Sequence, residues 1–289
     1  MPTKLDVSQH GSPRNALLLA QACALAYLAE PQAAQGFRET LGFDDARLIS
    51  ADNTQVYLAR SPEVLLVAFR GSECPTSLDG FKDWLLTNAN NYLILPEGRI
   101  GTDFAAAGVG ARFHRGFMSA LDEIWAPLFA AVDEAMNQAS RPLWVTGHSL
   151  GGALALLAAW RFERNFLTVD EIVTFGAPMI GNDAAASAFE KQFAKKISRY
   201  VNLEDPVPLL PSVSLLTNTY VHCPTEVSLA AADATSALDV LKQKAGAAAD
   251  AVLNASVIDD VWNAVQGRIA AHFIDHYLDR VQKKIDELA

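Results

Sequence analysis

Short apolar runs rich in β-branched residues alternate with longer stretches of alanine, leucine and other helix formers along this chain. Runs of the first kind are typical of strands, and the longer stretches are typical of helices. Strands are predicted over residues 55–60, 64–69, 143–146, 172–175, 197–203 and 219–223. Helices are predicted over residues 14–29, 117–139, 150–164, 182–195, 226–265 and 268–287.

Strands and helices alternate from Leu143 onward, which predicts an α/β fold with a mainly parallel sheet covered by helices on both faces. Residues 64–69 (VLLVAF) are apolar without alternation, as expected for a central strand that is buried on both sides. Ligands of such sheets bind beyond the carboxyl ends of the strands. Arg70, Gly71 and Ser72 follow this strand directly, so we expect functional groups there.

Size and composition favour one globular unit. The chain has 289 residues, 51% of them hydrophobic, without repeats or linker-like tracts, so we expect a single domain over residues 1–289. A formal net charge of -10 makes nucleic acid and anionic membrane surfaces poor partners. Three cysteines, far apart and in no metal-ligand spacing, indicate neither a disulfide framework nor a metal site.

The apolar stretch at residues 16–29 resembles a signal or anchor, but it is too short to span a bilayer. No basic cluster precedes it, and Ser12 and Pro13 are typical of the cap and first residue of an ordinary helix. We therefore expect a buried helix, with Cys23 as a small apolar residue in it. Without a signal peptide, the protein is expected to be cytoplasmic or exported without a recognisable N-terminal signal.

The motif Gly147-x-Ser149-x-Gly151 lies between the predicted strand at 143–146 and the predicted helix at 150–164. A serine at a sharp strand-to-helix turn between glycines is the pattern of a nucleophile elbow. The glycines are needed because the turn is tight and the helix packs closely on the sheet. Ser149 is therefore the candidate nucleophile for acyl transfer.

A serine nucleophile needs a base and an acid that orients the base, in the chain order serine, acid, histidine for this type of fold. Asp205 follows a predicted strand and is the preferred acid, although an aspartate before proline also simply begins turns. Asp183 and Glu204 are the alternatives.

Three histidines follow Asp205. His222 lies in a predicted strand, where a packed histidine is the commoner case. His272 and His276 are one turn apart on the predicted final helix, and His272 is preferred as the base, with His276 as the alternative.

The developing oxyanion needs fixed donors. The N–H of Leu150 is one candidate, and Ser72 offers both an N–H and a hydroxyl, although residues 70–72 also fit a simple strand-ending turn. Residues 78–86 carry apolar side chains at helical spacing, which fits either a lid over an acyl groove or a helix packed permanently on the core. The apolar positions of this segment are Leu78, Phe81, Trp84 and Leu85.

Several motifs together resemble the class 3 lipases, the family of the filamentous-fungal triacylglycerol lipases, from about residue 13 to 281. The matching segments are residues 67–72 (VAFRGS), 83–85 (DWL), 113–117 (FHRGF), 146–152 (TGHSLGG), 174–178 (TFGAP), 181–182 (GN) and 205–208 (DPVP). The resemblance implies an α/β-hydrolase fold with a short helical lid at about residues 74–90. Residues 226–265 depart from the fungal pattern as an alanine-rich insertion, predicted to be helical.

The resemblance implies Ser149 as nucleophile, Asp205 as acid, and Ser72 with Leu150 as the oxyanion hole. It favours His272 over His276, because bacterial members tend to carry a tyrosine five positions after the histidine, as Tyr277 does here. It also implies structural roles for the histidines of two matching segments, which are His114 and His148.

The expected activity is that of a serine carboxylic-ester hydrolase, and a triacylglycerol lipase leads. No cofactor or metal is expected. The expected partners are an acylglycerol or other lipid ester and, through the lid, a transient lipid–water interface. The alternatives are an esterase for soluble short-chain or aryl esters, a hydrolase-fold protein that binds a lipid or protein without catalysis, and an acyltransferase that uses the same acyl-enzyme.

Overall fold

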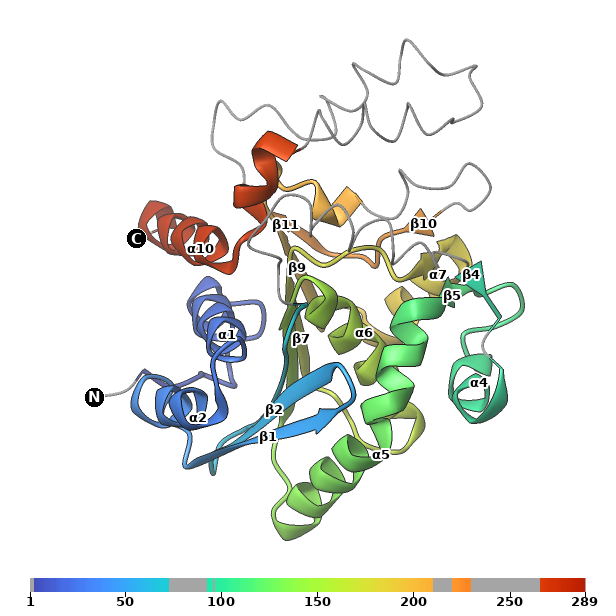
Figure 1. The fold of residues 1–289 in the computed structure, drawn as a ribbon, viewed down its shortest axis with the longest axis horizontal. Helices are drawn as coiled ribbons and strands as arrows, with labels where there is room; N and C mark the ends of the chain where they lie inside the picture. The colour runs from blue at the N-terminus through green and yellow to red at the C-terminus, as the bar shows by residue number, and fades with distance from the viewer. Residues whose placement is uncertain (1–2, 73–92, 96, 210–219, 230–265, 289) are drawn as a thin grey trace.

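The computed structural model describes residues 3–72, 93–95, 97–209, 220–229 and 266–288 (Figure 1). These residues form a seven-stranded central sheet, in which β1, β2 and β3 are antiparallel neighbours and all further pairs are parallel. In order across the sheet, the strands are β1 (Asp45–Ala51), β2 (Thr54–Arg60), β3 (Leu65–Phe69), β6 (Leu143–His148), β7 (Glu171–Phe175), β9 (Ile197–Val201) and β11 (Glu226–Ser228).

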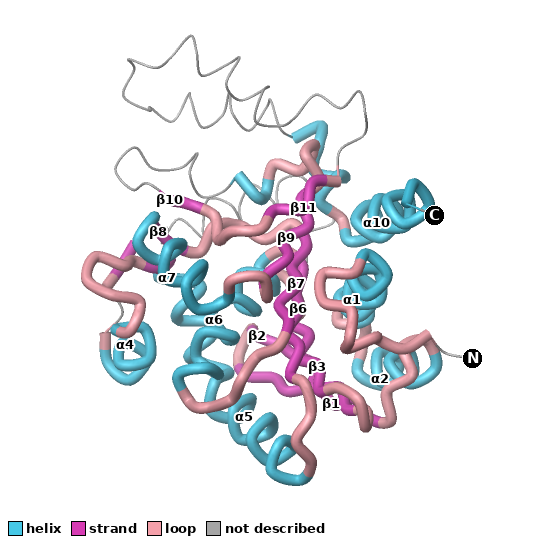
Figure 2. Tube along the Cα trace, turned by 180° about the vertical axis from the view of Figure 1, so that it is seen from behind, coloured by secondary structure: helices cyan, strands magenta, loops and turns pink. Residues whose placement is uncertain are grey.

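Helices cover both faces of this sheet, which Figure 2 shows nearly edge-on. One face carries α1 (Pro13–Leu25), α2 (Glu30–Glu39) and α10 (Ile274–Leu288). The other carries α4 (Gly98–Ala105), α5 (Arg115–Gln138), α6 (Leu150–Arg164) and α7 (Asp183–Phe193). Each face has its own hydrophobic core, because the side chains of a strand alternate between the two sides.

The register of the central strands determines where the candidate residues meet. Phe69 at the end of β3 pairs with Gly147 of β6, and His148 pairs with Phe175 of β7. The segment that follows Phe69 therefore lies beside Ser149 at the carboxyl edge of the sheet. All residues of β3 are buried, as its uninterrupted apolar sequence predicts.

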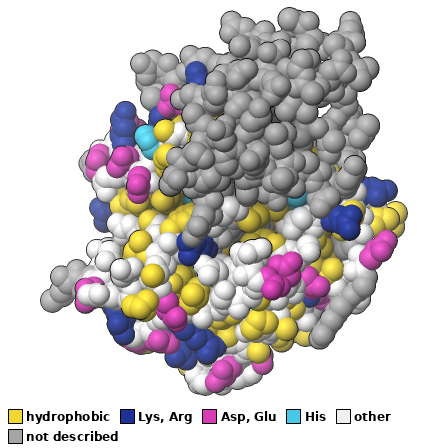
Figure 3. All heavy atoms as spheres, viewed as in Figure 1, with side chains coloured by type: hydrophobic (Ala, Val, Ile, Leu, Met, Phe, Trp, Pro, Cys, Tyr) yellow, Lys and Arg dark blue, Asp and Glu magenta, His cyan; other side chains and the backbone are white. Residues whose placement is uncertain are grey.

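A second, four-stranded sheet lies beside α7. Its strands are short, and their order is β10 (Tyr220–Val221), β8 (Gly181–Asn182), β5 (Phe113–His114) and β4 (Leu93–Ile94). Within the described ranges, every helix falls short of the length and apolarity that a bilayer-spanning segment needs. Lysine and arginine side chains are interspersed with aspartate and glutamate on the face shown in Figure 3.

The predicted α/β architecture and the long buried helices are found, whereas several elements, including α4, β4, β5 and β8, were not predicted. β1 was not predicted, because it is an edge strand with exposed and charged positions rather than an apolar run. α2 was not predicted either. It begins at Glu30 with Pro31 in its first turn, where proline is tolerated in a helix.

A further difference concerns the predicted helix at 226–265. Its first residues, Glu226–Ser228, form β11, which adds to β9 as a parallel edge strand, so this part of the prediction is wrong. The alanine-rich context favoured a helix, but pairing with the backbone of β9 outweighs local propensity there. Residues 230–265 lie outside the described part of the chain.

Candidate active site

Ser149 lies between β6 and α6 in a backbone conformation that is rare for residues with a side chain, with φ 58° and ψ −131°. Its N–H donates to Phe175 O at 3.0 Å, which fixes the turn to β7. A Cβ at Gly147 would collide with the backbone of Gly151, and a Cβ at Gly151 would lie 2.5 Å from Phe69 O. The glycines of the motif therefore allow the close approach of α6 to the sheet that presents Ser149.

Ser149, His272 and Asp205 form a continuous hydrogen-bonded chain. Ser149 Oγ lies 2.8 Å from His272 Nε2, and His272 Nδ1 lies 2.7 Å from Asp205 Oδ2. All three residues are at most 5% exposed. Because an ionised carboxylate only accepts hydrogen bonds, Nδ1 carries the proton, which leaves Nε2 as the acceptor for the serine hydroxyl.

The Asp205 carboxylate has donors on both oxygens. Val207 N donates to Oδ1 at 2.8 Å, and the hydroxyl of Tyr277 donates to Oδ2 at 2.6 Å. Burial, together with the charge of Asp205, raises the pKa of Tyr277 well above its usual value, so Tyr277 remains a donor. Gly176 leaves room for this arrangement, since a Cβ there would lie 2.9 Å from both Asp205 Oδ2 and the Tyr277 hydroxyl oxygen.

His148 holds the backbone of His272. Its Nε2 lies 2.7 Å from the carbonyl oxygen of His272, and its Nδ1 lies 2.8 Å from the hydroxyl of Tyr27. Burial lowers the pKa of His148 well below its usual range, so the ring is neutral and donates from one nitrogen only. Since a carbonyl accepts, Nε2 is that donor, and Tyr27 donates to Nδ1.

Ser72 and Leu150 lie at the edge of the sheet where β3 and β6 end, and both line a cavity of about 400 Å³. Gly71 sets the path of the segment that carries Ser72. A Cβ at Gly71 would lie 2.7 Å from His148 O and would collide with the Tyr27 hydroxyl. The segment can therefore pass this close to β6 only without a side chain at this position.

A model of the family described as Lipase (class 3) matches residues 66–215 of this chain. The chain belongs to the class 3 lipase family. This region contains Ser149 and Asp205 but ends before His272, so the histidine of the hydrogen-bonded chain lies outside the matched part.

Curated relatives of this lipase-family chain include "Secreted mono- and diacylglycerol lipase 3" of Gibberella zeae, with 35% identity over 123 residues, 41% of this chain and 37% of that protein. "Phospholipase A(1) DAD1, chloroplastic" of Arabidopsis thaliana is 28% identical over 160 residues, 52% of this chain and 34% of that protein. The aligned parts thus span about a third of the relatives' length.

Solved structures of fungal lipases are similar in fold. The Rhizomucor miehei triacylglyceride lipase superposes with a TM-score of 0.58 at 24% identity, covering 75% of this chain and 79% of that one. The Lip2 lipase of Yarrowia lipolytica has a TM-score of 0.58 at 22% identity, covering 79% and 81%. The predicted α/β-hydrolase fold is confirmed.

The alternatives considered for the acid and the base lie apart from the Ser149 chain. Asp183 is the first residue of α7, and Glu204 pairs with Arg280. His222 bonds Pro208 O at 2.7 Å, and burial lowers its pKa to about 3. His276 is exposed on α10.

The placement of His272 on the final helix is corrected by the structure. His272 ends a separate 3₁₀ helix, Gln266–His272, and α10 begins only at Ile274. The two histidines therefore lie on different elements, and the local break allows His272 to point at Ser149.

The sequence did not identify Tyr27 as a site residue. It indicated Tyr277 only by its spacing from His272 and did not predict the contact of its hydroxyl with Asp205. Tyr27 follows the apolar helix α1 and Tyr277 lies in the first turn of the amphipathic helix α10, and both are typical of ordinary core positions, so no sequence signal identifies their hydroxyl contacts. The predicted lid at residues 74–90, with Leu78, Phe81, Trp84 and Leu85, lies outside the described residues and stays a prediction.

No metal centre is evident among the described residues, where no group of three or more His, Cys, Asp or Glu side chains converges. Cys23 and Cys223 are buried free thiols, and burial raises the pKa of each to about 12. Neither is suited to act as a thiolate at neutral pH.

Proposed function

We propose that this protein hydrolyses carboxylic esters of acylglycerols through an acyl-enzyme on Ser149. The observation that carries the proposal is the buried hydrogen-bonded chain from Ser149 through His272 to Asp205. In this chain His272 is the general base and then the general acid, and Asp205 orients it and stabilises the imidazolium. We also propose that residues 1–289 form one domain.

In the proposed reaction, Ser149 Oγ attacks the ester carbonyl while its proton passes to His272 Nε2. The negative charge that forms on the carbonyl oxygen is stabilised by the N–H of Leu150 and by the N–H or hydroxyl of Ser72. The intermediate collapses, and the leaving alcohol takes the proton from His272. Water then attacks the acyl-enzyme with His272 as base, which releases the fatty acid and restores the serine.

The choice of acylglycerols rests on the family and on the names of the relatives. Fungal relatives are described as mono- and diacylglycerol lipases, and a plant relative as a phospholipase A(1). The formal net charge of -10 favours an uncharged ester over an anionic one. Triacylglycerol, diacylglycerol and monoacylglycerol are therefore the substrates to compare first.

The test measures hydrolysis of p-nitrophenyl esters of increasing acyl length and of mono-, di- and trioctanoylglycerol. Ser149→Ala and His272→Ala are expected to lower kcat by about 10⁴-fold or more. His276→Ala is the matched control, because it removes an exposed histidine close in sequence and should keep wild-type kcat. Loss of activity in His276→Ala with retention in His272→Ala would overturn the assignment, and a folded wild type that cleaves none of these esters would overturn the function.

A further inference from the structure

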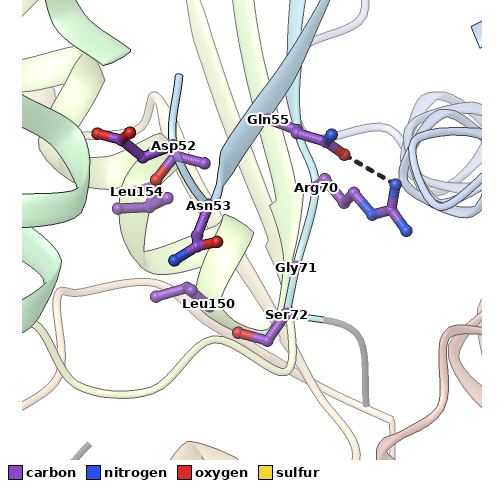
Figure 4. Close-up of a pocket in the computed structure, with 9 residues that line it drawn as sticks. Asp52, Asn53, Gln55, Arg70, Gly71, Ser72, Leu150 and Leu154 are labelled. Carbon is purple, nitrogen blue, oxygen red and sulfur yellow. Dashed lines mark hydrogen bonds between the residues drawn. The ribbon is translucent and has the colours of Figure 1, made fainter. Parts of the chain in front are cut away.

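The cavity that Ser72 and Leu150 line lies between α6 and the turn that joins β1 to β2 (Figure 4). We call it the hairpin cavity. Its volume is about 400 Å³. The residues that line it are Asp52, Asn53, Thr54, Gln55, Arg70, Gly71, Ser72, Leu150 and Leu154.

The two sides of the hairpin cavity differ in chemistry. Leu150 and Leu154, one turn apart on α6, form an apolar wall. Opposite them, Asp52 and Asn53 at the hairpin turn supply a carboxylate and an amide. In Figure 4 the side chains of Asn53 and Ser72 both point toward Leu150, so polar and apolar groups border the same space.

Asp52 and Asn53 are the hairpin side chains available to a ligand. Both are exposed, and neither makes a side-chain hydrogen bond with the described part of the protein. The hydroxyl of Thr54, by contrast, is used inside the fold, where it donates to Ala120 O at 3.3 Å.

The cation nearest to the cavity is directed elsewhere. Arg70 extends to the opposite side of the strands, where its Nη1 donates to Gln55 Oε1 at 2.8 Å and its guanidinium lies 5.9 Å from the centre of the Tyr27 ring. Among the described lining residues, the remaining charge is the carboxylate of Asp52, which lies at the hairpin end of the cavity and points away from Ser72 (Figure 4). This charge repels phosphate, whereas a carboxylate and an amide together accept and donate hydrogen bonds to hydroxyl groups.

We infer that the hairpin cavity binds the uncharged, hydroxyl-bearing alcohol part of the ester, as in a monoacylglycerol. This inference rests on the proposed function. An ester oxygen held between Ser72 and Leu150 lies at the end of the cavity next to Asn53, so a group a few bonds away is directed toward the Asn53 amide (Figure 4). A long acyl chain is a less suitable occupant than a hydroxyl-bearing group, because it cannot form hydrogen bonds with the Asn53 amide.

The test compares two esters with the same acyl chain, 1-monooctanoylglycerol and ethyl octanoate, on the wild type and on Asn53→Leu. The glyceryl-to-ethyl ratio of kcat/KM is expected to fall about tenfold in Asn53→Leu, which corresponds to ~1.4 kcal/mol. Ser50→Ala, an exposed residue of β1 that does not line the cavity, is the matched control and keeps the ratio. An unchanged ratio in Asn53→Leu, with ethyl octanoate cleaved normally, overturns the inference.

Asp52 provides a second arm. Asp52→Asn keeps a residue that tolerates the positive φ of 48° and removes the charge. It is expected to raise hydrolysis of dioctanoylphosphatidylglycerol relative to dioctanoylglycerol severalfold. A wild type that prefers the phosphatidylglycerol overturns the inference.

Measuring ester binding in the absence of hydrolysis tests this inference independently of the proposed function. In the Ser149→Ala background, 1-monooctanoylglycerol is expected to bind about tenfold more tightly than ethyl octanoate, and Asn53→Leu is expected to abolish the difference. Equal binding of the two esters overturns the inference whether or not the wild type hydrolyses either one, whereas the proposed function fails only if the wild type cleaves none of the esters.

Discussion

Replacing Tyr277 with phenylalanine removes one donor from the Asp205 carboxylate and also the acceptor of Asn202 N, which donates to the Tyr277 hydroxyl at 3.3 Å. Tyr277 is fully buried, and its hydroxyl lies 2.6 Å from Asp205 Oδ2. A hydrogen bond to a charged group contributes about 1.5–3 kcal/mol to stability. Asp205 keeps Val207 N on its other oxygen and His272 Nδ1 on the same one, so the carboxylate remains in position.

The larger expected effect is therefore on stability. The free energy of unfolding of Tyr277→Phe should fall by about 2 kcal/mol, measured by urea denaturation. The kcat for p-nitrophenyl octanoate should fall by roughly three- to tenfold with KM unchanged, because the orientation of His272 is loosened but not lost.

Two results would refute this reasoning. A loss of kcat of a thousandfold or more at unchanged stability would mean that Tyr277 takes part in the chemistry directly. Unchanged stability together with unchanged kcat would mean that the contact contributes nothing. Leu278→Ala, the neighbouring position on α10, serves as a control for general loosening of the helix, since it should lower stability without lowering kcat.

Three further predictions concern residues around the site. Tyr27→Phe leaves a buried nitrogen of His148 without its donor and should lower both the free energy of unfolding, by about 1–3 kcal/mol in urea denaturation, and kcat. Gly71→Ala should abolish most ester hydrolysis in a protein that still folds, as seen by circular dichroism, because the added Cβ displaces the segment that carries Ser72. Burial lowers the pKa of His114 to about 4 from 6.5, so its stabilising contribution is complete above about pH 6.5 and is lost as the pH falls toward 4. His114→Asn, which keeps an acceptor at the start of α5, should reduce the loss of unfolding free energy between these pH values by about 3 kcal/mol in urea titrations.

The fold could be predicted where local pattern and tertiary packing agree. β3 is apolar and buried throughout, and α6 is apolar and buried from Gly151 to Trp160, so composition alone indicates their place. β11 and the break before α10 could not be predicted, because pairing with β9 and the hydrogen bonds of His272 decide them rather than local propensity.

Some residues of the candidate site could likewise be predicted from the sequence, and others could not. Ser149 can be found from sequence because the glycines that its turn requires are adjacent in the chain. The contact between Asp205 and His272 joins residues 67 positions apart. Chain order and the positions of strand ends therefore reduce the number of candidate acids and bases, but they do not show which two side chains meet. The hydroxyl contacts of Tyr27 and Tyr277 depend on packing between distant helices, for which a single sequence carries no signal.

The link from Tyr27 through His148 to the carbonyl of His272 has a consequence for the order of assembly. Ser149 obtains its strained turn from β6 and α6, which are close in sequence, so this part of the site can form early. The proposed base, His272, is held in place through Tyr27, which follows α1, and through Tyr277 on α10. These two helices pack against each other. During synthesis, a chain that still lacks α10 therefore has Ser149 in its turn but no positioned His272 to accept its proton. The nucleophilic reactivity of Ser149 is expected only after α1 and α10 have packed together.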